Sequence, residues 1–306
     1  SRSQKQDHLI FQEIVLEPMN AKVVFGLGRL SILSKCPDDV RSTRKLSFSK
    51  DVVGDHFYDT KKTQAIRYCA LTQLEQTTSD DERLSQAIYE QRMEQIPERF
   101  TQTYRQVPAT DVLVLQQVLA QIDPPESGVL ASVEAVKTFL ESNYRYTLDR
   151  PAQKDPSALK DFLVDQKEGH CEYFATAMVL LLRQMGIAAR IVNGFSGGKR
   201  NRFDDFIAIR QSNAHSWVEI FMPTKQCDGN NECAIVGSWL TIDPTPSSEI
   251  SSLGPSVTRD FVDAIQLKWN QYVIRYNLNT QLSWVKGVFE WLTPSPPNVL
   301  NKPNSR

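Results

Sequence analysis

The stretch 169-GHCEYFATAMVLLLRQMG-186 has a cysteine, Cys171, near its start and continues as a strongly apolar run. Its large apolar side chains recur at steps of four, three and four residues, the spacing of one helix face: Phe174, Met178, Leu181 and Met185. Gly186 follows them, as glycine often does just past a helix end. The pattern predicts a buried helix with Cys171 in its first turn, where the partial positive charge of the helix N-terminus lowers the pKa of a thiol.

The segments after this helix are predicted to be strands. Four runs rich in strand-forming residues follow, at 189–195, 206–210, 215–221 and 238–243. Strand alternation puts His215 and Trp217 on one face of the third run, and Asp243 ends the fourth. A helix laid across these antiparallel strands would bring Cys171, His215 and Asp243 together.

Cys171, His215 and Asp243 follow one another along the chain at gaps of 44 and 28 residues. A thiol needs a base to become a good nucleophile, and the base needs an orienting partner. Each residue also has a plain structural interpretation: a small core residue for Cys171, a packed histidine for His215 and a turn residue for Asp243. Their order on helix, strand and strand favours one catalytic site over three unrelated structural residues.

Five motifs between residues 127 and 246 resemble those of the transglutaminase-like superfamily, whose core is similar to that of papain-type cysteine peptidases. They are 143-NYRYT-147, 169-GHC-171, 182-LRQMGIAAR-190, 213-NAHSWVE-219 and 241-TIDPTP-246. The resemblance implies an α+β fold, with a helix packed on an antiparallel sheet. It makes Cys171 the nucleophile, His215 the base and Asp243 the orienting acid. A closer resemblance, which includes 269-WNQYVIRY-276, is to the bacterial membrane-anchored group typified by the TgpA proteins.

The activity that the resemblance implies is acyl transfer from a glutamine side chain of a protein substrate. An amine such as lysine would accept the acyl group and give an isopeptide bond, whereas water would give deamidation. One alternative is a cysteine peptidase or amidase that uses the same triad. The other is a non-catalytic binding module, against which the intact set of Cys171, His215 and Asp243 argues.

Four aromatic residues are candidates to line the site: Trp217, Tyr144, Tyr146 and Tyr173. Trp217 shares the strand face of His215, and Tyr144 and Tyr146 correspond to an aromatic pair in the family pattern, with core packing as the competing interpretation. The oxyanion of acyl transfer needs hydrogen-bond donors, and the backbone N–H of Cys171 is the natural first one. No Cys/His spacing resembles a zinc site and no calcium-loop pattern is present, so we expect no metal or other cofactor.

The chain is predicted to have three parts: an N-terminal β-rich domain at 1–107, a transglutaminase-like core at 108–250 and a helical segment at 251–306 that leads towards a membrane anchor. Short strand-like runs separated by Gly, Pro and Asp occupy residues 9–107 and favour a small β-sandwich. We expect caps at Thr110 and Ser127 for the first two helices of the later parts. The predicted helices are 111–122, 129–143, 158–164 and 258–291.

The five cysteines are an odd number. Cys227 and Cys233 flank a polar loop and are predicted to form a small disulfide. Cys36 and Cys69 lie in the N-terminal region and are predicted to pair, which leaves Cys171 as the free thiol. Two disulfides would indicate an oxidising compartment. The alternative is a reduced cytosolic protein with five free thiols.

Charge and hydropathy indicate whether the chain binds nucleic acid or spans a membrane. The net charge of the 306 residues is −1, with both signs spread along the chain, so nothing indicates a nucleic-acid partner. No segment approaches the roughly 20 apolar residues of a membrane-spanning helix, and no signal peptide is visible. Together with the resemblance, this predicts an excised periplasmic domain of an inner-membrane protein, with membrane helices beyond both of its ends.

Overall fold

The computed structural model describes residues 9–17, 23–27, 29–34, 36, 47–50, 56–59, 65–73, 84–122, 128–149, 157–227 and 232–246. The chain divides into two units, residues 1–198 with 209–254 and residues 199–208 with 255–306. The predicted C-terminal helix at 258–291 lies outside the described residues.

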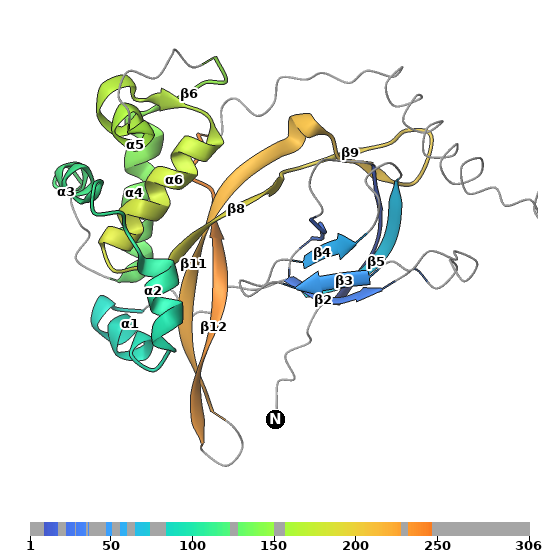
Figure 1. Ribbon diagram of the computed structural model, residues 1–306, viewed down its shortest axis with the longest axis horizontal. Helices are drawn as coiled ribbons and strands as arrows, with labels where there is room; N and C mark the ends of the chain where they lie inside the picture. The colour runs from blue at the N-terminus through green and yellow to red at the C-terminus, as the bar shows by residue number, and fades with distance from the viewer. Residues whose placement is uncertain are drawn as a thin grey trace, which may run out of the picture. The chain divides into compact units, whose positions relative to one another are not determined.

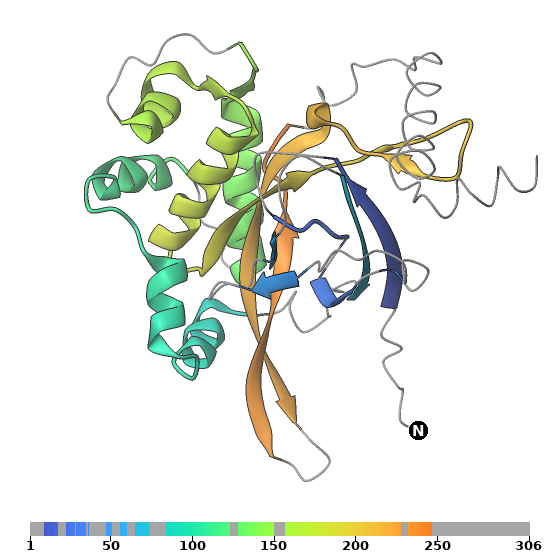
Figure 2. The same cartoon turned by 45° about the vertical axis from the view of Figure 1, so that its right-hand side comes forward.

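A three-stranded antiparallel sheet with the order β12-β11-β8 belongs to the first unit (Figure 1). Its strands are β8 (Ala189–Phe195), β11 (Ala214–Cys227) and β12 (Cys233–Ile242). The middle strand, β11, pairs with β8 through residues 214–220 and with β12 through residues 218–227. Past residue 220 the β11–β12 pair continues as a two-stranded arm (Figures 1 and 2). Three of the four predicted strands are therefore confirmed.

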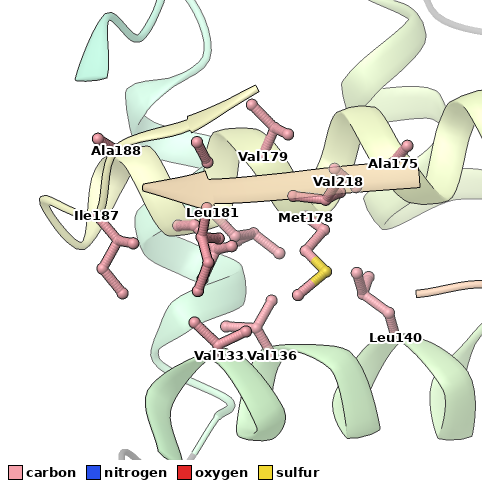
Figure 3. Close-up of a cluster of buried hydrophobic side chains, with 14 of the residues drawn as sticks. Val133, Val136, Leu140, Ala175, Met178, Val179, Leu181, Ile187, Ala188 and Val218 are labelled. Carbon is pink, nitrogen blue, oxygen red and sulfur yellow. The ribbon is translucent and has the colours of Figure 1, made fainter. Parts of the chain in front are cut away.

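The predicted buried helix is α6 (Cys171–Gln184), which packs on β8 and β11. The helix also packs against α4 (Val129–Asn143), and Figure 3 shows Met178 and Leu181 among the side chains that fill the space between α4 and β11. Both side chains are fully buried, and each such burial stabilises the fold by about 1.5–3 kcal/mol. Gly186 adopts a φ of 81° just past the helix end, a conformation that glycine takes without steric cost, so the predicted end is confirmed.

The predicted helix caps are wrong where the structure describes them. The bounds of α4 match the prediction, but its N-cap residue is Gly128, which makes no side-chain bond, and Ser127 lies outside the described residues. The N-cap residue of α3 (Val112–Leu119) is Asp111 and not Thr110. The Thr110 hydroxyl instead donates to the Asp111 carboxylate at 3.3 Å.

Residues 86–93 and 98–105 are helical, and the strand-like character predicted through residue 107 is wrong there. The two helices are α1 (Gln86–Met93) and α2 (Glu98–Arg105). Tyr89 and Tyr104 join the same buried cluster as α6. Both helices are short and rich in polar residues, and the packing of their few core-facing residues stabilises them.

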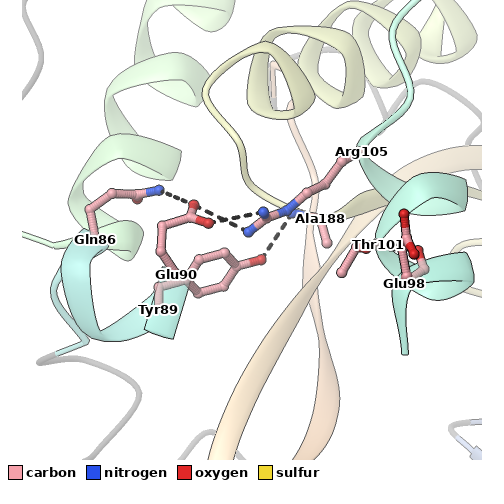
Figure 4. Close-up of polar contacts among 7 residues, drawn as sticks. All are labelled: Gln86, Tyr89, Glu90, Glu98, Thr101, Arg105 and Ala188. Carbon is pink, nitrogen blue, oxygen red and sulfur yellow. Dashed lines mark hydrogen bonds and ion pairs between the residues drawn. The ribbon is translucent and has the colours of Figure 1, made fainter. Parts of the chain in front are cut away.

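A polar network attaches α1 and α2 to the turn between α6 and β8 (Figure 4). The Tyr89 hydroxyl accepts the backbone N–H of Ala188 at 2.9 Å. Arg105 donates to both carboxylate oxygens of Glu90, at 2.9 and 3.2 Å, and its guanidinium lies 5.5 Å from the centroid of the Tyr89 ring. Because the hydroxyl of Tyr89 is bonded, its burial leaves no unsatisfied polar atom.

Short elements lead the chain into α6. The strand β6 (Arg145–Tyr146) pairs in parallel with β7 (Glu168–Gly169). The helix predicted at 158–164 is a short α5 (Ala158–Lys160) that continues as the π-helix η2 (Asp161–Gln166).

The N-terminal region of the first unit consists of small antiparallel sheets. One has the order β1-β5-β2, with β1 (Leu9–Leu16), β2 (Arg29–Ser34) and β5 (Ile66–Gln73), and the other pairs β3 (Ser47–Lys50) with β4 (His56–Asp59). Tyr58 of β4 and Tyr68 of β5 lie in one buried cluster. The two sheets share this cluster, and Cys36 is disulfide-bonded to Cys69, as predicted.

The second unit is described at residues 199–208, where β9 (Lys199–Arg200) and β10 (Ile207–Ala208) form a short antiparallel hairpin. The strand predicted at 206–210 is thus reduced to two residues. A 3-10 turn at Gln211–Asn213 leads into β11. Helices and mainly antiparallel sheets together confirm the α+β class.

Candidate active site

Cys171 is the first residue of α6, and its thiol is half-buried. The other cysteines form the two predicted disulfides, Cys36–Cys69 and Cys227–Cys233, so Cys171 is the free thiol. The parallel β6–β7 pair fixes the backbone just before it, because Thr147 donates its N–H to the Gly169 carbonyl at 2.9 Å. The sulfur therefore lies at the positive end of a helix whose start is held in place.

His215 is the second residue of β11, and its side chain is 9% exposed. Its Nε2 atom lies 2.7 Å from Oδ2 of Asp243. The Cys171 thiol also helps to raise the pKa of this ring, and Nδ1 is the ring nitrogen that the contact with Asp243 leaves available to the thiol. The structure thus brings the base between the thiol and the acid, in the order that the sequence predicted.

Asp243 immediately follows β12. One carboxylate oxygen bonds His215, and the other accepts the backbone N–H of Thr245 at 3.0 Å. A bond from an Asp side chain to the backbone two residues on is an Asx turn, which fixes the rotation of the carboxylate. Thr245 was missed by the sequence interpretation, although the spacing in 243-DPT-245 is what an Asx turn requires.

The three groups shift one another's pKa values. The hydrogen bond to Asp243, followed by the bond to Cys171, raises the pKa of His215 from 6.5 to about 9. Burial raises the pKa of Cys171, but bonds from His215 and from the backbone N–H and hydroxyl of Ser216 outweigh it, so the thiol pKa is lowered from 9.0. Burial likewise raises the pKa of Asp243, and the bonds from His215 and Thr245 lower it overall. The lowered thiol pKa and the raised imidazole pKa both shift the pair towards thiolate and imidazolium, and the two groups titrate as a coupled pair.

Trp217 covers one side of His215. The two rings are stacked, with centroids 6.3 Å apart and planes inclined by 27°. Gly194 lies across from His215 on β8, and a Cβ atom added there would come within 2.7 Å of the Trp217 ring. The glycine therefore leaves the space that the indole occupies beside the imidazole.

The three predicted tyrosines lie in different surroundings. Tyr144 is buried, stacks on Phe162 at 5.0 Å and donates its hydroxyl to the Leu163 carbonyl at 3.0 Å. Burial raises its pKa to about 12. These contacts place Tyr144 in the core, so the competing interpretation of core packing describes it better than a site-lining role.

Tyr146 and Tyr173 lie closer to the start of α6. Tyr146 pairs with Gly169 across β6 and β7, and its ring lies 6.3 Å from Phe174. Tyr173 approaches His170 edge-on at 4.8 Å. With Ala158, Leu159, Phe162, Glu172 and Thr176 it lines a small cavity of about 180 Å³. These contacts show where the two rings pack, and contact with a substrate remains a prediction.

The described residues of the chain, 9–246 with the gaps given above, hold neither a metal-binding cluster nor a helix that could span a membrane. No group of three or more His, Cys, Asp or Glu residues is arranged there to hold a metal ion. Among the helices of these residues, none is long and apolar enough to cross a membrane.

Known proteins resemble the part of the chain that carries this geometry. Residues 114–244 match the transglutaminase-like superfamily. The protein-glutamine gamma-glutamyltransferase of Pseudomonas aeruginosa is 34% identical over 131 residues, which cover 43% of this chain and 17% of that protein. The uncharacterized protein YebA of Bacillus subtilis is 29% identical over 153 residues, which cover 48% of this chain and 19% of that protein. The matched regions thus span less than a fifth of either relative.

Solved structures add a likeness in fold. The periplasmic domain of TgpA from Pseudomonas aeruginosa matches with a TM-score of 0.54 at 19% identity, covering 90% of this chain and 77% of that one. The same domain bound to ethylmercury gives a TM-score of 0.53 at 20% identity, covering 79% and 73%. The match over residues 114–244 confirms the predicted resemblance to the transglutaminase-like superfamily, and the solved structures agree with it in fold.

Proposed function

We propose that this domain catalyses acyl transfer from a protein glutamine through Cys171, His215 and Asp243. The observation that carries the proposal is the 2.7 Å bond between His215 and Asp243, with the lone free thiol of the described residues on the other side of the imidazole. A non-catalytic module would have no need to lower the pKa of that thiol.

In the proposed reaction the Cys171 thiolate attacks the carboxamide carbon of a glutamine side chain. The oxygen takes up negative charge, which the backbone N–H of Cys171 is placed to stabilise. The imidazolium of His215 donates its proton to the departing nitrogen. Ammonia then leaves, and a thioester between Cys171 and the substrate remains. His215 is then neutral and can accept a proton from the attacking amine.

The second half of the reaction decides the product. Attack by a lysine amine on the thioester releases the thiolate and forms an isopeptide bond, whereas attack by water gives glutamate. The name of the Pseudomonas aeruginosa relative, protein-glutamine gamma-glutamyltransferase, supports the first outcome. A peptidase or amidase would instead take a main-chain or other amide as the acyl donor.

Incubation with a glutamine-bearing peptide and a labelled primary amine, read by mass spectrometry, separates these outcomes. Addition of the amine with loss of ammonia supports the proposal, and the small mass gain of deamidation supports water as the acceptor. Cleavage of the peptide chain supports the peptidase. Cys171→Ala is the control, and any product that it still forms does not come from this site.

We also propose that the domain works in the periplasm, held to the inner membrane by segments outside this chain. The two disulfides support an extracytoplasmic location, and the TgpA domain of similar fold is periplasmic. Fractionation of cells that express the full-length protein, with protease added to spheroplasts, tests both parts. Protection of the domain until the inner membrane is opened would contradict the periplasmic location.

A further inference from the structure

Ser216 lies beside the Cys171 sulfur because of how α6 packs on β11. Ala175 and Val218 both belong to the buried cluster between these two elements (Figure 3). Cys171 precedes Ala175 by four residues, which is about 6 Å along a helix. Ser216 precedes Val218 by two residues, which is about 6.7 Å along a strand. This placement agrees with the pKa of the Cys171 thiol, which the backbone N–H and the hydroxyl of Ser216 help to lower.

The Ser216 hydroxyl has a second partner on the neighbouring strand. Asn193 of β8 is paired directly with Ser216 of β11, and the hydroxyl donates to the Asn193 side-chain oxygen at 2.6 Å. Ser216 is 4% exposed, so its hydroxyl is largely shielded from water, whereas Asn193 is exposed. A hydroxyl has one hydrogen. It cannot donate to the amide of Asn193 and to a thiolate at the same time.

We propose that Ser216 and Asn193 are positioning residues for Cys171, with the Ser216 hydroxyl donating to the sulfur while it is a thiolate and to Asn193 while it carries a proton or an acyl group. The proposal rests on the proposed role of Cys171 as nucleophile, but it requires no particular acyl donor or acceptor. The hydroxyl adds a donor to the charged sulfur, and Asn193 holds the same hydrogen when the sulfur is neutral.

The charged groups around the sulfur act separately from this pair. From β11, His215 faces the thiol, with Asp243 behind it after β12. On α6 itself, Glu172 is exposed and lies 4.0 Å from His170, and the Arg145–Glu168 ion pair joins β6 to β7. Ser216 and Asn193 are neutral, so replacing them leaves these charges unchanged.

The test is the rate of alkylation of Cys171 by iodoacetamide as a function of pH, which reports the apparent thiol pKa without a glutamine or an amine. Ser216→Ala removes a bond to the thiolate, and we expect the pKa to rise by roughly one unit, with alkylation about tenfold slower at a pH below both values. Asn193→Leu removes the competitor for the hydrogen, and we expect the pKa to fall, by a few tenths of a unit.

The double variant provides the sharpest comparison. Because Asn193 acts through the hydroxyl, Ser216→Ala combined with Asn193→Leu should have the pKa of Ser216→Ala alone. Circular dichroism of each variant checks folding, and Cys171→Ala shows that the measured label is on this thiol. A merely structural pair would alter stability without moving the two pKa values in opposite directions.

Three results would overturn the proposal: no change in either folded variant, changes of the same sign, or additive effects in the double variant. A rise in the pKa of Asn193→Leu would mean that the amide donates to the hydroxyl, which is the reverse of the proposed bond. If the glutamine assay gave no product, the alkylation results could still be interpreted, because alkylation measures the thiol alone. The two proposals can therefore fail separately.

Discussion

Replacing Asp243 by asparagine removes the negative charge that faces His215 and keeps the size of the side chain. The rise in the His215 pKa from 6.5 to about 9 corresponds to about 3.4 kcal/mol at 1.36 kcal/mol per pKa unit. Asp243 is its largest cause and Cys171 the next. Since the Asp243 side chain is 40% exposed and solvent screens its charge, we assign it about 1–2 kcal/mol.

This free energy sets the expected loss of reactivity. Near neutral pH the imidazole of Asp243→Asn should hold its proton less tightly, so less thiolate forms and alkylation of Cys171 slows by roughly 5- to 30-fold. The loss is smaller than the roughly 10⁴-fold of a serine-protease triad, because a thiol ionises far more readily than a hydroxyl. The difference should shrink as pH rises, since hydroxide then ionises the thiol without help from His215.

The assay is the pH dependence of iodoacetamide alkylation, with folding checked by circular dichroism. Glu219→Gln is a matched control, because Glu219 lies on the same strand face as His215 but forms its ion pair with Arg190 at 2.7 Å. It should leave the pH profile of the thiol unchanged. If well-folded Asp243→Asn were alkylated as fast as the wild type at every pH, the acid would have no part in ionising Cys171 and the reasoning would be refuted.

Three further outcomes are expected. Gly194→Ala should displace the Trp217 ring, which a new Cβ would approach to 2.7 Å, and lower the free energy of unfolding by about 1–3 kcal/mol in urea denaturation; unchanged stability would mean that the ring moves freely. Tyr144→Phe leaves the buried Leu163 carbonyl without its donor and should lower the free energy of unfolding by about 1–2 kcal/mol, while the alkylation rate of Cys171 stays the same. A slower rate would mean that Tyr144 acts in the site. Cys36 and Cys69 are 33 residues apart, and reducing their disulfide should lower the free energy of unfolding by about 3–4 kcal/mol, because the unfolded chain gains the entropy of the opened loop. A denaturation midpoint that reductant does not change would contradict this.

Much of the site could be predicted because its residues lie on elements with strong periodicity. The apolar spacing of α6 placed Cys171 in the first turn of a helix, and the alternation of β11 put His215 and Trp217 on one face. The same alternation assigns Ser216 to the face of Val218, towards the helix. The sequence interpretation followed only the face that bears the histidine, and so it missed Ser216.

The missed and corrected features depend on contacts between distant residues. Tyr144 looked like a site residue from its place in the family pattern, but its hydroxyl reaches the Leu163 carbonyl 19 residues away. The helices α1 and α2 have mostly polar sequences, and they are fixed by buried residues such as Tyr89, whose hydroxyl bonds Ala188 99 residues along the chain. Local spacing carries no information about such partners, because it reports the period of one element and not what packs against it.

The precision of the site comes from strand register. His215 lies on β11 and Asp243 immediately follows β12, and the pairing of these two strands is fixed at ten positions, from Val218 opposite Ile242 to Cys227 opposite Cys233. A slip of one residue would turn every side chain of β12 to the other face and separate Asp243 from His215. The long two-stranded arm does not reach the thiol, but each of its pairs opposes such a slip, and the disulfide at its tip joins the last pair covalently. Residues far from the chemistry thereby hold the 2.7 Å contact on which the base depends.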